Sequence, residues 1–463
     1  MNKRFAVIGG GAAGTAAALS LLELDPTCTI DIFEQDNRLG GVAHSNTVRG
    51  MEINYGVQGV HSSFVHTISM IERARAHDLS IPKLFPTNLT SKFTAMGRVT
   101  SLDQSTKMFT DDVLHLRRFC IDARKYPDFY AIMTVVDAVP AFGVSSAFIH
   151  TILLPLLALF FGTGNQTSQL PAAMAALVFD VDGRPSDNNV NQSEDQKMEN
   201  FGRSAVTLFG LDRATGISLK PGTMLALPPL ARVYSALQHI LEQSGRVRLR
   251  LGTGVTAISE DSDTVQVYFG TGNQATFDRV VLAAQANHAA KLLNPSSAKA
   301  RLLRRIRYYR DVTVTHQDTQ HMEATFGYDG KHNYYVNARS DLDMDLGFDL
   351  TLYQNLPEPV YQTILLHPVS SERLENIDKK LMVTHWHQMA HTVGQLVNVT
   401  ARLRTVQGPR VFLCGSYVLV NSHEIAVMSG IRAAQLVCGD TSFPSNTFGK
   451  PSSAFSQFQK IVF

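Results

Sequence analysis

The sequence has few cysteines, almost no net charge and no apolar stretch of membrane-spanning length. Its cysteines are far apart and form no C-x-x-C pair, which excludes a disulfide framework and a thiolate zinc site. The 42 basic and 40 acidic side chains leave a formal net charge of +2, unlike the basic surface of a dedicated nucleic-acid binder. No repeat of solenoid length occurs. We expect a globular protein of a reducing compartment, the cytoplasm, that acts on a small molecule.

The strongest apolar stretch is Ala147–Phe161, AFIHTILLPLLALFF. It is shorter than the ~20 residues that span a bilayer and contains His150 and Pro155, so it predicts no transmembrane segment. Two interpretations stay open. The stretch forms a buried helix or the wall of an apolar cavity, or it makes a peripheral membrane contact that takes up lipophilic substrate.

What the sequence does contain is a strand, glycine turn, helix and strand at its start. Phe5–Gly9 is a short apolar run, Ala12–Leu24 is rich in alanine and leucine, and Thr29–Glu34 alternates in period two. This order predicts a βαβ unit with a parallel sheet. The length of 463 residues, 44% of them hydrophobic, allows about two to four folding units around a large core.

The residues from Gly9 to Gly14, GGGAAG, fit the pattern G-x-G-x-x-G. In this pattern the first glycine allows a tight turn, the second lets the backbone approach a pyrophosphate, and the third lets the helix pack on the strand. The helix would direct unpaired N–H groups and its positive dipole end at the phosphates. The position of the motif, between a strand and a helix, predicts a dinucleotide site.

Glu34 ends the next predicted strand, twenty residues after Gly14. A carboxylate at this place accepts hydrogen bonds from the ribose hydroxyls of an adenosine and disfavours the 2′-phosphate of NADP. No second G-x-G-x-x-G with a strand and an acidic partner is present. We therefore expect one dinucleotide and no separate NAD(P)H domain.

Similar strand patterns return later in the chain. Beta patterns occur at Val247–Leu251, Val255–Ser259, Thr264–Phe269, Arg279–Ala284 and Arg410–Cys414, with a helix predicted over Ile425–Val437. The turns at Ser244-Gly245 and Gly270–Asn273 suit short antiparallel connections. Helical patterns at Ser145–Leu159 and Pro171–Phe179 precede a polar loop, Asp182–Glu199, and strand-like segments follow at Tyr334–Val336 and Asp349–Tyr353. Because the chain begins and ends in the same strand-glycine-helix pattern, we expect one discontinuous domain with another inserted into it.

Glu34 is followed by five residues and then by Gly40-Gly41. This E-x5-G-G arrangement resembles the FAD signature of the glutathione-reductase-like flavoproteins, particularly the flavin amine oxidase and phytoene desaturase branch. Asn54–Val60 (NYGVQGV), Asp278–Ala284 (DRVVLAA) and Phe412–Arg432 resemble further segments of that branch. The resemblance implies FAD, with the first segment beside the flavin ring, the second ending near the adenosine and the third directing helix N–H groups at the flavin O2 edge.

The form of these segments resembles one subgroup of amine-oxidase-like FAD-binding oxidoreductases, to which polyunsaturated fatty acid isomerases are distantly related. Cys414–Tyr417 and His423-Glu424 are similar to its C-G-A-Y and H-E motifs, and Leu302–His316 with Asp318 is similar to its R-Y-x-R … H-x-D stretch. The cofactor contacts that the resemblance implies are Gly9, Gly11, Ala12, Ala13, Gly14, Glu34, Gln35, Arg38, Gly40, Gly41, Val42, Val57, Gln58, Val255 (through its main chain), Ala283, Gly415, Ser416, His423 and Glu424.

The chain departs from this branch in three respects. Ser416 replaces the usual acidic residue after the strand glycine, so a carboxylate contact with the ribityl chain or pyrophosphate is absent. No S-G-C triplet of the kind that attaches flavin in monoamine oxidases occurs, and Cys414 falls inside a predicted strand, so noncovalent FAD is expected. The lysine that holds a flavin-bound water in many amine oxidases has no counterpart around Tyr308–Thr315, which weakens the amine-oxidation hypothesis.

Few catalytic side chains are expected, because a flavin supplies the hydride chemistry itself. Gln58 and His423 are the candidates. Gln58 would bond flavin N5 or O4 or orient substrate, or else its amide is satisfied by backbone groups. His423, next to Glu424, would contact the cofactor or substrate, or else the pair caps the helix.

Two other clusters have an ordinary structural alternative. His385, His387 and His391 fall on a predicted helix, where an i, i+4 pair can bind zinc, but no H-E-x-x-H glutamate accompanies them. We expect exposed helix-face histidines there and no metal. The stretch Arg301–Arg310 could steer a carboxylate substrate or form a solvated helical face.

The sequence thus predicts an α/β protein with a Rossmann-like FAD-binding domain and an interleaved α+β substrate domain. The FAD domain would comprise residues 1–80, 215–295 and 405–440, the substrate domain 81–214 and 296–404, and a C-terminal tail 441–463. The expected function is an FAD-dependent oxidoreductase of the oxidase or desaturase type, which transfers a hydride from a small lipophilic or amine-like substrate to flavin N5.

Two alternatives remain. The first is a flavin-dependent double-bond isomerase without net redox change. The second is a non-catalytic binding protein, since the Rab GDP dissociation inhibitors resemble this fold without a flavin.

Overall fold

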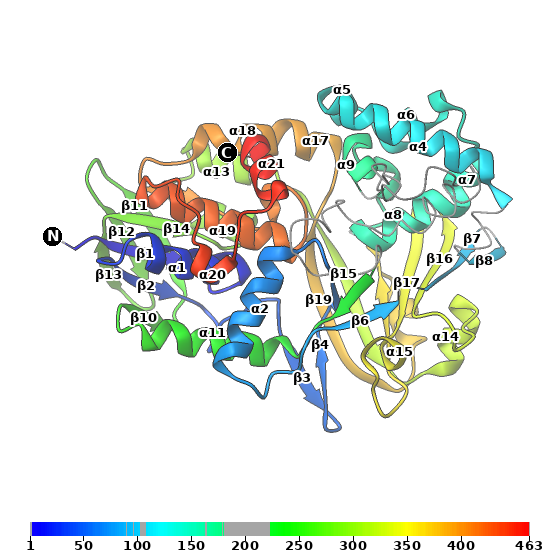
Figure 1. The fold of residues 1–463 in the computed structure, drawn as a ribbon, viewed down its shortest axis with the longest axis horizontal. Helices are drawn as coiled ribbons and strands as arrows, with labels where there is room; N and C mark the ends of the chain where they lie inside the picture. Colours follow the sequence, from blue (N-terminus) through cyan, green and yellow to red (C-terminus); the bar gives the residue numbers. More distant parts are fainter. Residues whose placement is uncertain are drawn as a thin grey trace, which may run out of the picture.

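The computed structural model describes residues 2–88, 90–95, 97–101, 108–162, 164–177, 179 and 223–462. The predicted polar loop Asp182–Glu199 and the proposed boundary at residue 215 lie outside the described residues. The described elements gather into two ends, one around a five-stranded sheet and one around a seven-stranded sheet (Figure 1).

The five-stranded sheet is parallel throughout and begins with the predicted βαβ unit. Strand β1 (Arg4–Ile8) leads through the glycine turn into α1 (Ala12–Leu24) and on to β2 (Thr29–Phe33). The strand order is β10-β2-β1-β14-β20, with β10 (Val247–Arg250), β14 (Arg279–Leu282) and β20 (Val411–Leu413) contributed by distant parts of the chain. The chain is therefore an α/β protein with a Rossmann-like sheet.

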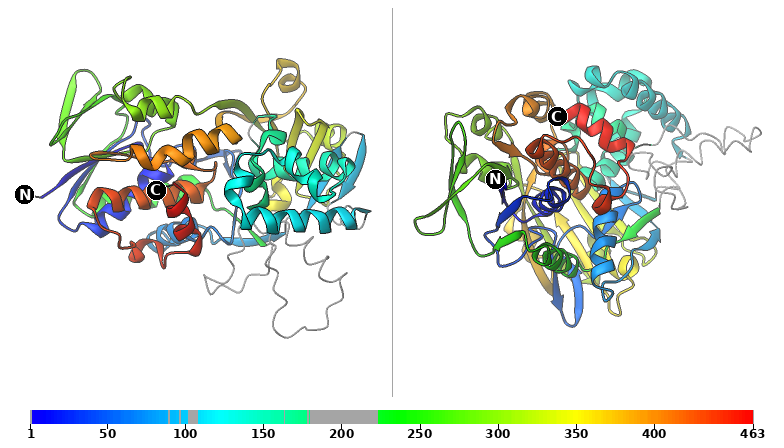
Figure 2. Two further views of the ribbon diagram at one scale, coloured as in Figure 1. Left: turned by 90° about the horizontal axis from the view of Figure 1, so that it is seen from above. Right: turned by 60° about the vertical axis from the view of Figure 1, so that its left-hand side comes forward.

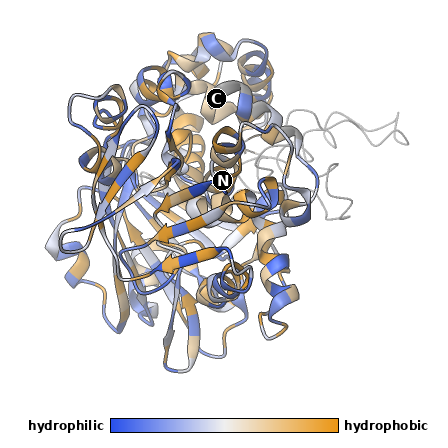
Figure 3. Cartoon of the chain, turned by 90° about the vertical axis from the view of Figure 1, so that its left-hand side faces the viewer, coloured by the Kyte–Doolittle hydropathy of each residue, from blue (hydrophilic) through white to orange (hydrophobic). Residues whose placement is uncertain are grey.

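Helices and a small antiparallel sheet cover this parallel sheet. Helix α1 packs lengthwise on α19 (His423–Cys438), and α2 (Val65–His77) packs on α11 (Leu230–Gln243). The antiparallel strands β11 (Val255–Glu260), β12 (Val265–Phe269) and β13 (Asn273–Phe277) are anchored to the sheet by the ring of Phe33, whose centroid lies 4.9 Å from Phe269 and 5.9 Å from Phe277. Apolar residues run through the strands and inner helices, and hydrophilic residues gather in the outer loops (Figure 3).

The seven-stranded sheet forms the other end, in the order β19-β15-β18-β17-β16-β7-β8. Its strands are antiparallel except for the parallel pair β16 and β7. The strands are β7 (Ser91–Ala95), β8 (Arg98–Ser101), β15 (Tyr308–His316), β16 (Tyr334–Ser340), β17 (Asp343–Asp349), β18 (Tyr361–Leu365) and β19 (Lys380–Met389).

A group of helices lies against one face of the seven-stranded sheet (Figure 2). It comprises α4 (Thr110–Lys125), α5 (Pro127–Ala131), α6 (Val135–Ala138), η1 (Val139–Phe142), α7 (Ser146–Phe148), η2 (Ile149–Leu153), α8 (Leu154–Phe161), η3 (Thr167–Gln169) and α9 (Ala172–Leu177). The apolar run forms one continuous helical segment over residues 146–161, which contacts β16 and β17 through α8. Its π-helical turn ends two residues before Pro155, which has no N–H to donate.

The apolar helix is buried in the protein, as the first of the two interpretations predicts. Ile152, Leu153, Leu154, Leu156 and Leu157 are each at most 2% exposed and belong to the main core, which extends through both ends of the molecule. Within the described part of the chain, no helix combines the length and the apolarity needed to cross a bilayer.

Short elements connect the two ends. The hairpin β3 (Ser45–Val48) and β4 (Met51–Asn54) and the small sheet of β5 (Gly59–His61), β9 (Thr223–Ala226) and β6 (Phe85–Asn88) lie between them. The remaining helices are α12 (Ala286–Leu292), α13 (Ala298–Leu303), α14 (Thr319–Phe326), α15 (Leu350–Gln354), α16 (Ser371–Glu375), α17 (Val393–Gln395), η4 (Leu396–Thr400), α18 (Ala401–Leu403), η5 (Arg404–Val406), η6 (Ser416–Val418), α20 (Ser445–Phe448) and α21 (Ser453–Val462).

Four local predictions were wrong, including the helix expected at His385, His387 and His391, where the chain forms strand β19 up to Met389. The segment at Asp349–Tyr353 is not a strand, because Asp349 ends β17 and its side chain caps α15 by accepting the Leu352 N–H. The Ser244-Gly245 turn leads from α11 into a parallel strand, not into an antiparallel one. The arginine stretch is helical only as far as Leu303 and enters β15 at Tyr308.

Candidate FAD site and substrate face

The glycine turn between β1 and α1 has the geometry that a bound pyrophosphate needs. A methyl group built on Gly9, whose φ is +104°, would lie 2.8 Å from the carbonyl oxygen of Ala283, and one on Gly14 would lie 1.8 Å from the carbonyl oxygen of Gly9. A methyl group on Gly11 would have no heavy atom of the described residues within 4 Å. Gly9 and Gly14 therefore close the turn, and Gly11 faces open space.

The second glycine pair lies directly against the first. The Gly40 N–H donates to the Gly10 carbonyl oxygen at 2.8 Å, and a methyl group on Gly41 would lie 3.3 Å from the Gly11 Cα. Next to this contact, the apolar side chain of Val42 is 64% exposed. The two glycine motifs thus form one continuous backbone surface with an apolar residue at its border.

Glu34 is buried, and its carboxylate holds the glycine turn. Its Oε2 accepts the Gly10 N–H at 2.6 Å and its Oε1 accepts the Asp36 N–H at 2.9 Å. An ionised carboxylate has about four acceptor positions, so two remain for ribose hydroxyls. The predicted ribose contact is compatible with this geometry and remains a prediction.

Gln35, Arg38 and Val255 surround the expected adenosine end. Gln35 is exposed and lies next to Gly254, where β11 begins with Val255. The Arg38 Nη1 donates to the Gly41 carbonyl oxygen at 3.0 Å, so this side chain braces the second glycine pair. The three residues come from two sequence regions that the fold places together.

The helices α1 and α19 direct their N-termini at the same edge of the parallel sheet. Helix α1 follows strand β1, and α19 follows strand β20. The two helices pack closely, because a methyl group on Gly430 of α19 would lie only 2.2 Å from the carbonyl oxygen of Ala13 in α1. The N–H groups of Ala12 and Ala13 in α1, and of His423 and Glu424 in α19, precede the first intrahelical hydrogen bonds. Four backbone donors are therefore available to an anionic or carbonyl-bearing ligand.

Serine side chains hold the loop between β20 and α19 by accepting backbone N–H groups. The Gly415 N–H donates to Ser429 Oγ at 2.9 Å, and the Ser422 Oγ caps α19 by accepting the Ile425 N–H at 3.0 Å. The Ser416 hydroxyl lies 3.5 Å from Asn421 Oδ1. With this neutral side chain at residue 416, the loop carries no carboxylate towards the phosphates.

His423 and Glu424 make different contacts. His423 Nε2 lies 2.7 Å from the Tyr234 hydroxyl, and burial lowers the pKa of His423 to about 4, so the ring is neutral near pH 7. Glu424 turns away from the loop, and its carboxylate accepts the His66 and Thr67 N–H groups at the start of α2. His423 thus stays available as a neutral ring beside the site, whereas any cofactor contact of Glu424 would involve its backbone.

Gln58 lies in the predicted ring-side segment, where its amide is fully engaged. Its Nε2 donates to the Asn54 carbonyl oxygen at 2.8 Å and to Gln362 Oε1 at 2.9 Å, and its Oε1 accepts from Gln354. The structure thus agrees with the alternative in which the amide of Gln58 is satisfied by neighbouring groups. These hydrogen bonds fix the shape of the loop. The neighbouring Val57 is 54% exposed, so the loop presents an apolar side chain beside Gln58.

Side chains of the seven-stranded sheet face this loop, and no sequence pattern indicated them. A methyl group on Gly56 would lie 2.8 Å from the indole of Trp386, whose N–H donates to Thr313 Oγ1 at 2.8 Å. Nearby, Asn421 Nδ2 donates to Gln388 Oε1 at 3.3 Å. These residues come from β15, β19 and the loop before α19. The pairing register of β15 with β19 decides which of their side chains lie on the same face, and this register cannot be read from the sequence.

The histidine prediction was wrong about secondary structure. His385 and His387 lie on strand β19, exposed on the face opposite Trp386, and His391 follows the strand and is buried. Its Nε2 accepts the Asn421 N–H at 3.0 Å. Within the described residues, no three His, Cys, Asp or Glu side chains gather as a metal site would require.

Taken together, these residues fit an extended dinucleotide. Open space at Gly11, the donors at two helix N-termini, and exposed Val42 and Val57 lie along the edge where β1, β2, β14 and β20 end. Ligands of doubly wound sheets bind in this crevice. FAD would be held mainly by backbone groups, with Glu34 at its ribose, and would supply hydride chemistry at its flavin ring.

Comparisons with known proteins agree with this geometry. A family model described as "Flavin containing amine oxidoreductase" matches residues 163–322, and one described as "NAD(P)-binding Rossmann-like domain" matches residues 7–73. No curated protein matches the sequence.

Solved structures share the fold across nearly the whole chain. They include a cyclohexylamine oxidase from Brevibacterium oxydans IH-35A, at 14% identity and a TM-score of 0.65, and a variant of putrescine oxidase, at 13% and 0.65. A CLA-producing fatty acid isomerase from P. acnes has 15% identity and a TM-score of 0.66. In all three cases the match covers 95% of this chain and 99% of the other. The chain is an FAD-dependent oxidoreductase with the fold of the flavin-containing amine oxidoreductases.

Proposed function

We propose that the chain transfers a hydride from a lipophilic substrate to flavin N5, as an oxidase or desaturase. The observation that supports this is the surface of Trp386, Thr313 and Gln388, which faces the loop proposed to run beside the flavin ring. It presents an indole and an amide, and the buried Thr313 hydroxyl holds the indole in place. Such a surface can orient a C–H bond and exclude water, while bound FAD accepts the hydride.

An amine substrate is less well supported by this face. The one carboxylate of β15, Asp311, is 1% exposed and accepts the N–H groups of Gly164 and His367. Burial raises the pKa of Asp311 above the usual aspartate value, so the carboxylate is poorly suited to pair with an ammonium group. β15 contains no lysine.

The apolar helix α8 ends close to the residues that hold Gln388. Phe161 ends α8, and its ring centroid lies 5.6 Å from that of His391, which accepts the Asn421 N–H. The apolar helical segment is thus connected through two contacts to the residue that bonds Gln388. This arrangement favours a substrate with an apolar body over a small polar one.

The first experiment is to purify the protein and record its absorption spectrum. Oxidised flavin absorbs near 450 nm, and we expect this band at about one flavin per chain. Anaerobic addition of an oxidisable lipophilic substrate should bleach the band, and oxygen should restore it with release of hydrogen peroxide. A colourless protein would instead indicate the non-catalytic binding alternative.

The same experiment separates the isomerase alternative, whose support is the likeness in fold to the fatty acid isomerase. An isomerase returns the hydride to another carbon of the substrate, so it turns over without oxygen and without lasting bleaching. Turnover that stops when oxygen and other acceptors are removed would exclude the isomerase.

A variant pair tests the proposed surface. Trp386→Ala should lower kcat/KM by at least about tenfold, equivalent to roughly 1.4 kcal/mol, while flavin content stays unchanged. His385→Ala is the matched control, because His385 neighbours Trp386 on β19 but is exposed on the opposite face. Equal activities of the two variants would contradict the assignment of this face to substrate.

A further inference from the structure

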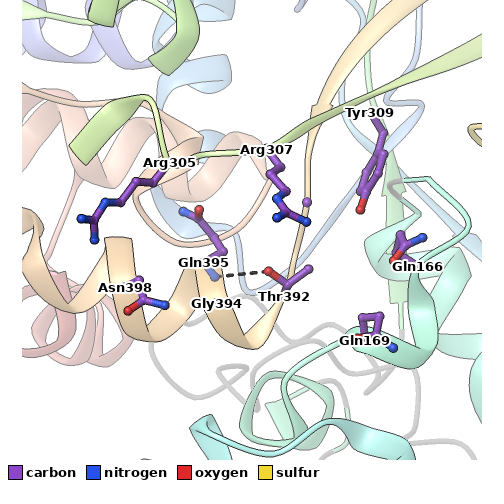
Figure 4. Close-up of a pocket in the computed structure, with 10 residues that line it drawn as sticks. Gln166, Gln169, Arg305, Arg307, Tyr309, Thr392, Gly394, Gln395 and Asn398 are labelled. Carbon is purple, nitrogen blue, oxygen red and sulfur yellow. Dashed lines mark hydrogen bonds between the residues drawn. The ribbon is translucent and has the colours of Figure 1, made fainter. Parts of the chain in front are cut away.

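A polar cavity opens where the segment that follows α8, the start of β15 and helix α17 meet (Figure 4). Its volume of about 500 Å³ lies in the range of small-molecule sites. It is lined from three sides by Gln166, by Arg305, Arg307 and Tyr309, and by Thr392 and Gln395. The cavity is separate from the glycine surface described above, and no residue of the expected FAD site lines it.

The cavity is positively charged. Arg305 and Arg307 line it, neither forms an ion pair within the part of the chain that the structure describes, and no acidic side chain is among the lining residues. The neighbouring Arg301 and Arg304 do not line the cavity and instead donate to the carbonyl oxygens of Ser296 and Pro295. Two guanidinium groups without a carboxylate partner select for an oxyanion.

Gln395 adds a buried polar group to the cavity. It is 6% exposed, its Nε2 donates to the Tyr417 carbonyl oxygen at 3.3 Å, and its Oε1 has no hydrogen-bond partner among the described residues. In Figure 4 its amide lies between the side chains of Arg305 and Arg307. A buried acceptor without a partner is costly, so a ligand donor or a bridging water beside the anion would stabilise it.

The cavity lies close to the proposed reaction surface. Tyr309 and Thr313 are on the same face of β15, four residues apart, which places them about 13 Å from each other. Thr313 bonds Trp386, and Gln395 bonds Tyr417 in the loop that leads to α19.

We propose that this cavity is an oxyanion subsite, in which Arg305 and Arg307 bind the carboxylate or phosphate of the lipophilic substrate. The proposal rests on the proposed function for the identity of the ligand as substrate. The anion site itself stands on the charge and geometry of the cavity. The two guanidinium groups bind the anionic group of the ligand.

The test measures binding to the FAD-loaded protein by calorimetry, with three probes kept below their micelle concentrations: dodecanoate, dodecyl phosphate and dodecanol. We expect at least one of the two anions to bind at least tenfold more tightly than dodecanol. Tighter binding of dodecanoate assigns the subsite to a carboxylate, and tighter binding of dodecyl phosphate assigns it to a phosphate. Equal affinity for all three probes would overturn the proposal.

Two double variants localise the effect. Arg305→Gln with Arg307→Gln should weaken anion binding at least tenfold and leave dodecanol binding unchanged. Arg301→Gln with Arg304→Gln removes the same charge outside the cavity and should leave both unchanged. Equal losses in the two double variants would mean general electrostatic attraction and would overturn the subsite. If the first variant fails to fold, Arg305→Lys with Arg307→Lys keeps the charge and removes the bidentate geometry, and it should weaken binding by a smaller factor.

These experiments distinguish failure of the oxyanion subsite from failure of the proposed hydride transfer. Arginine-dependent binding without any flavin reduction would leave the subsite standing and contradict the proposed hydride transfer. Flavin reduction by a lipophilic substrate at the same rate and KM in both double variants would support hydride transfer and remove the subsite.

Discussion

The two ends of the molecule use different parts of the chain for recognition. At the five-stranded sheet, the expected FAD contacts are backbone groups at glycine turns and helix N-termini, and Glu34 is itself bound to the Gly10 N–H. At the seven-stranded sheet, the candidate contacts are side chains: Trp386, Gln388 and the cavity arginines. A cofactor site made of backbone depends on where side chains are missing, whereas a substrate site made of side chains depends on which ones are present.

This difference explains how one fold serves unlike substrates. Glycines at positions where a methyl group would collide leave little freedom to change the cofactor end. The face of β15 and β19 keeps its backbone hydrogen bonds whatever side chains it carries, so it can be altered without loss of the sheet. The two ends should accordingly respond differently to substitution.

The largest expected effect is at Gly14. Gly14→Ala places a methyl group 1.8 Å from the Gly9 carbonyl oxygen, so the turn must move, with an overpacking cost of about 1–3 kcal/mol or more and loss of FAD. Gly11→Ala is the matched control: its φ of −69° suits alanine, and the methyl group points into open space. It should keep the fold of the apoprotein and lose FAD affinity.

Thermal unfolding of the apoproteins and flavin absorbance of the loaded ones measure these two effects. If Gly14→Ala unfolds at the same temperature as the unsubstituted chain, the close contact does not determine stability. If Gly11→Ala binds FAD normally, the open space beside Gly11 is not the phosphate site.

A smaller effect is expected at Glu34, the one side chain central to the cofactor end. Glu34→Ala removes the acceptor of the Gly10 N–H and the proposed ribose acceptor, and charge-assisted hydrogen bonds are each worth about 1.5–3 kcal/mol. We expect FAD to bind about tenfold to a hundredfold more weakly in equilibrium dialysis. Asp36→Ala is the control, because Asp36 meets Glu34 only through its backbone N–H. Unchanged affinity in Glu34→Ala would contradict both roles of this carboxylate.

Acid should also lower the folding stability through His391, at the substrate end. Burial lowers the pKa of His391 to about 4 from the ordinary 6.5, so the folded chain takes up this proton at lower pH than the unfolded chain does. Between these values the unfolded state binds more protons, and folding stability therefore falls as the pH drops from about 6.5 to 4, by at most roughly 3 kcal/mol. Above pH 6.5 this contribution is complete.

His391→Gln isolates this term, because the amide oxygen can still accept the Asn421 N–H but does not titrate. Urea unfolding at pH 7 and pH 4.5 should show a smaller loss of stability in the variant than in the unsubstituted chain. The same loss in both would assign the acid sensitivity to other groups, such as His316, whose pKa burial lowers to about 3.

The smallest effect is expected on the outer face of β19. His387→Ala removes an exposed side chain opposite the proposed substrate surface and should change stability by less than about 0.5 kcal/mol. Flavin content and turnover should stay the same. A loss of activity comparable to that of Trp386→Ala would mean that both faces of the strand serve the site.

The FAD end was predictable from the sequence because its signals are local. The spacing Gly9, Gly11, Gly14, then Glu34 and Gly40 reflects turns and close contacts within one βαβ unit, and the structure brings these residues together. The helix predicted over Ile425–Val437 is confirmed as α19, which is longer by two residues at its start and one at its end. The roles of the individual residues toward FAD stay predictions.

The substrate end was not predictable in the same way. His385, His387 and His391 were assigned to a helix because their spacing fits one, but β19 pairs with β15 along its whole length, and these tertiary hydrogen bonds override local propensity. The arginine stretch suggested a role in steering a carboxylate substrate, but it did not indicate that Arg305 and Arg307 line a cavity while Arg301 and Arg304 do not. Both cavity arginines lie in the segment between α13 and β15.

The sequence by itself determined the dinucleotide-binding βαβ unit and the acidic residue after it, because turn geometry and missing side chains act over a few residues. Tertiary structure decided which side chains share a face or a cavity: Trp386 with Gly56, Gln395 with Arg307, and His391 with Asn421. These pairs depend on strand register and on contacts between segments tens to hundreds of residues apart, and no local pattern encodes them.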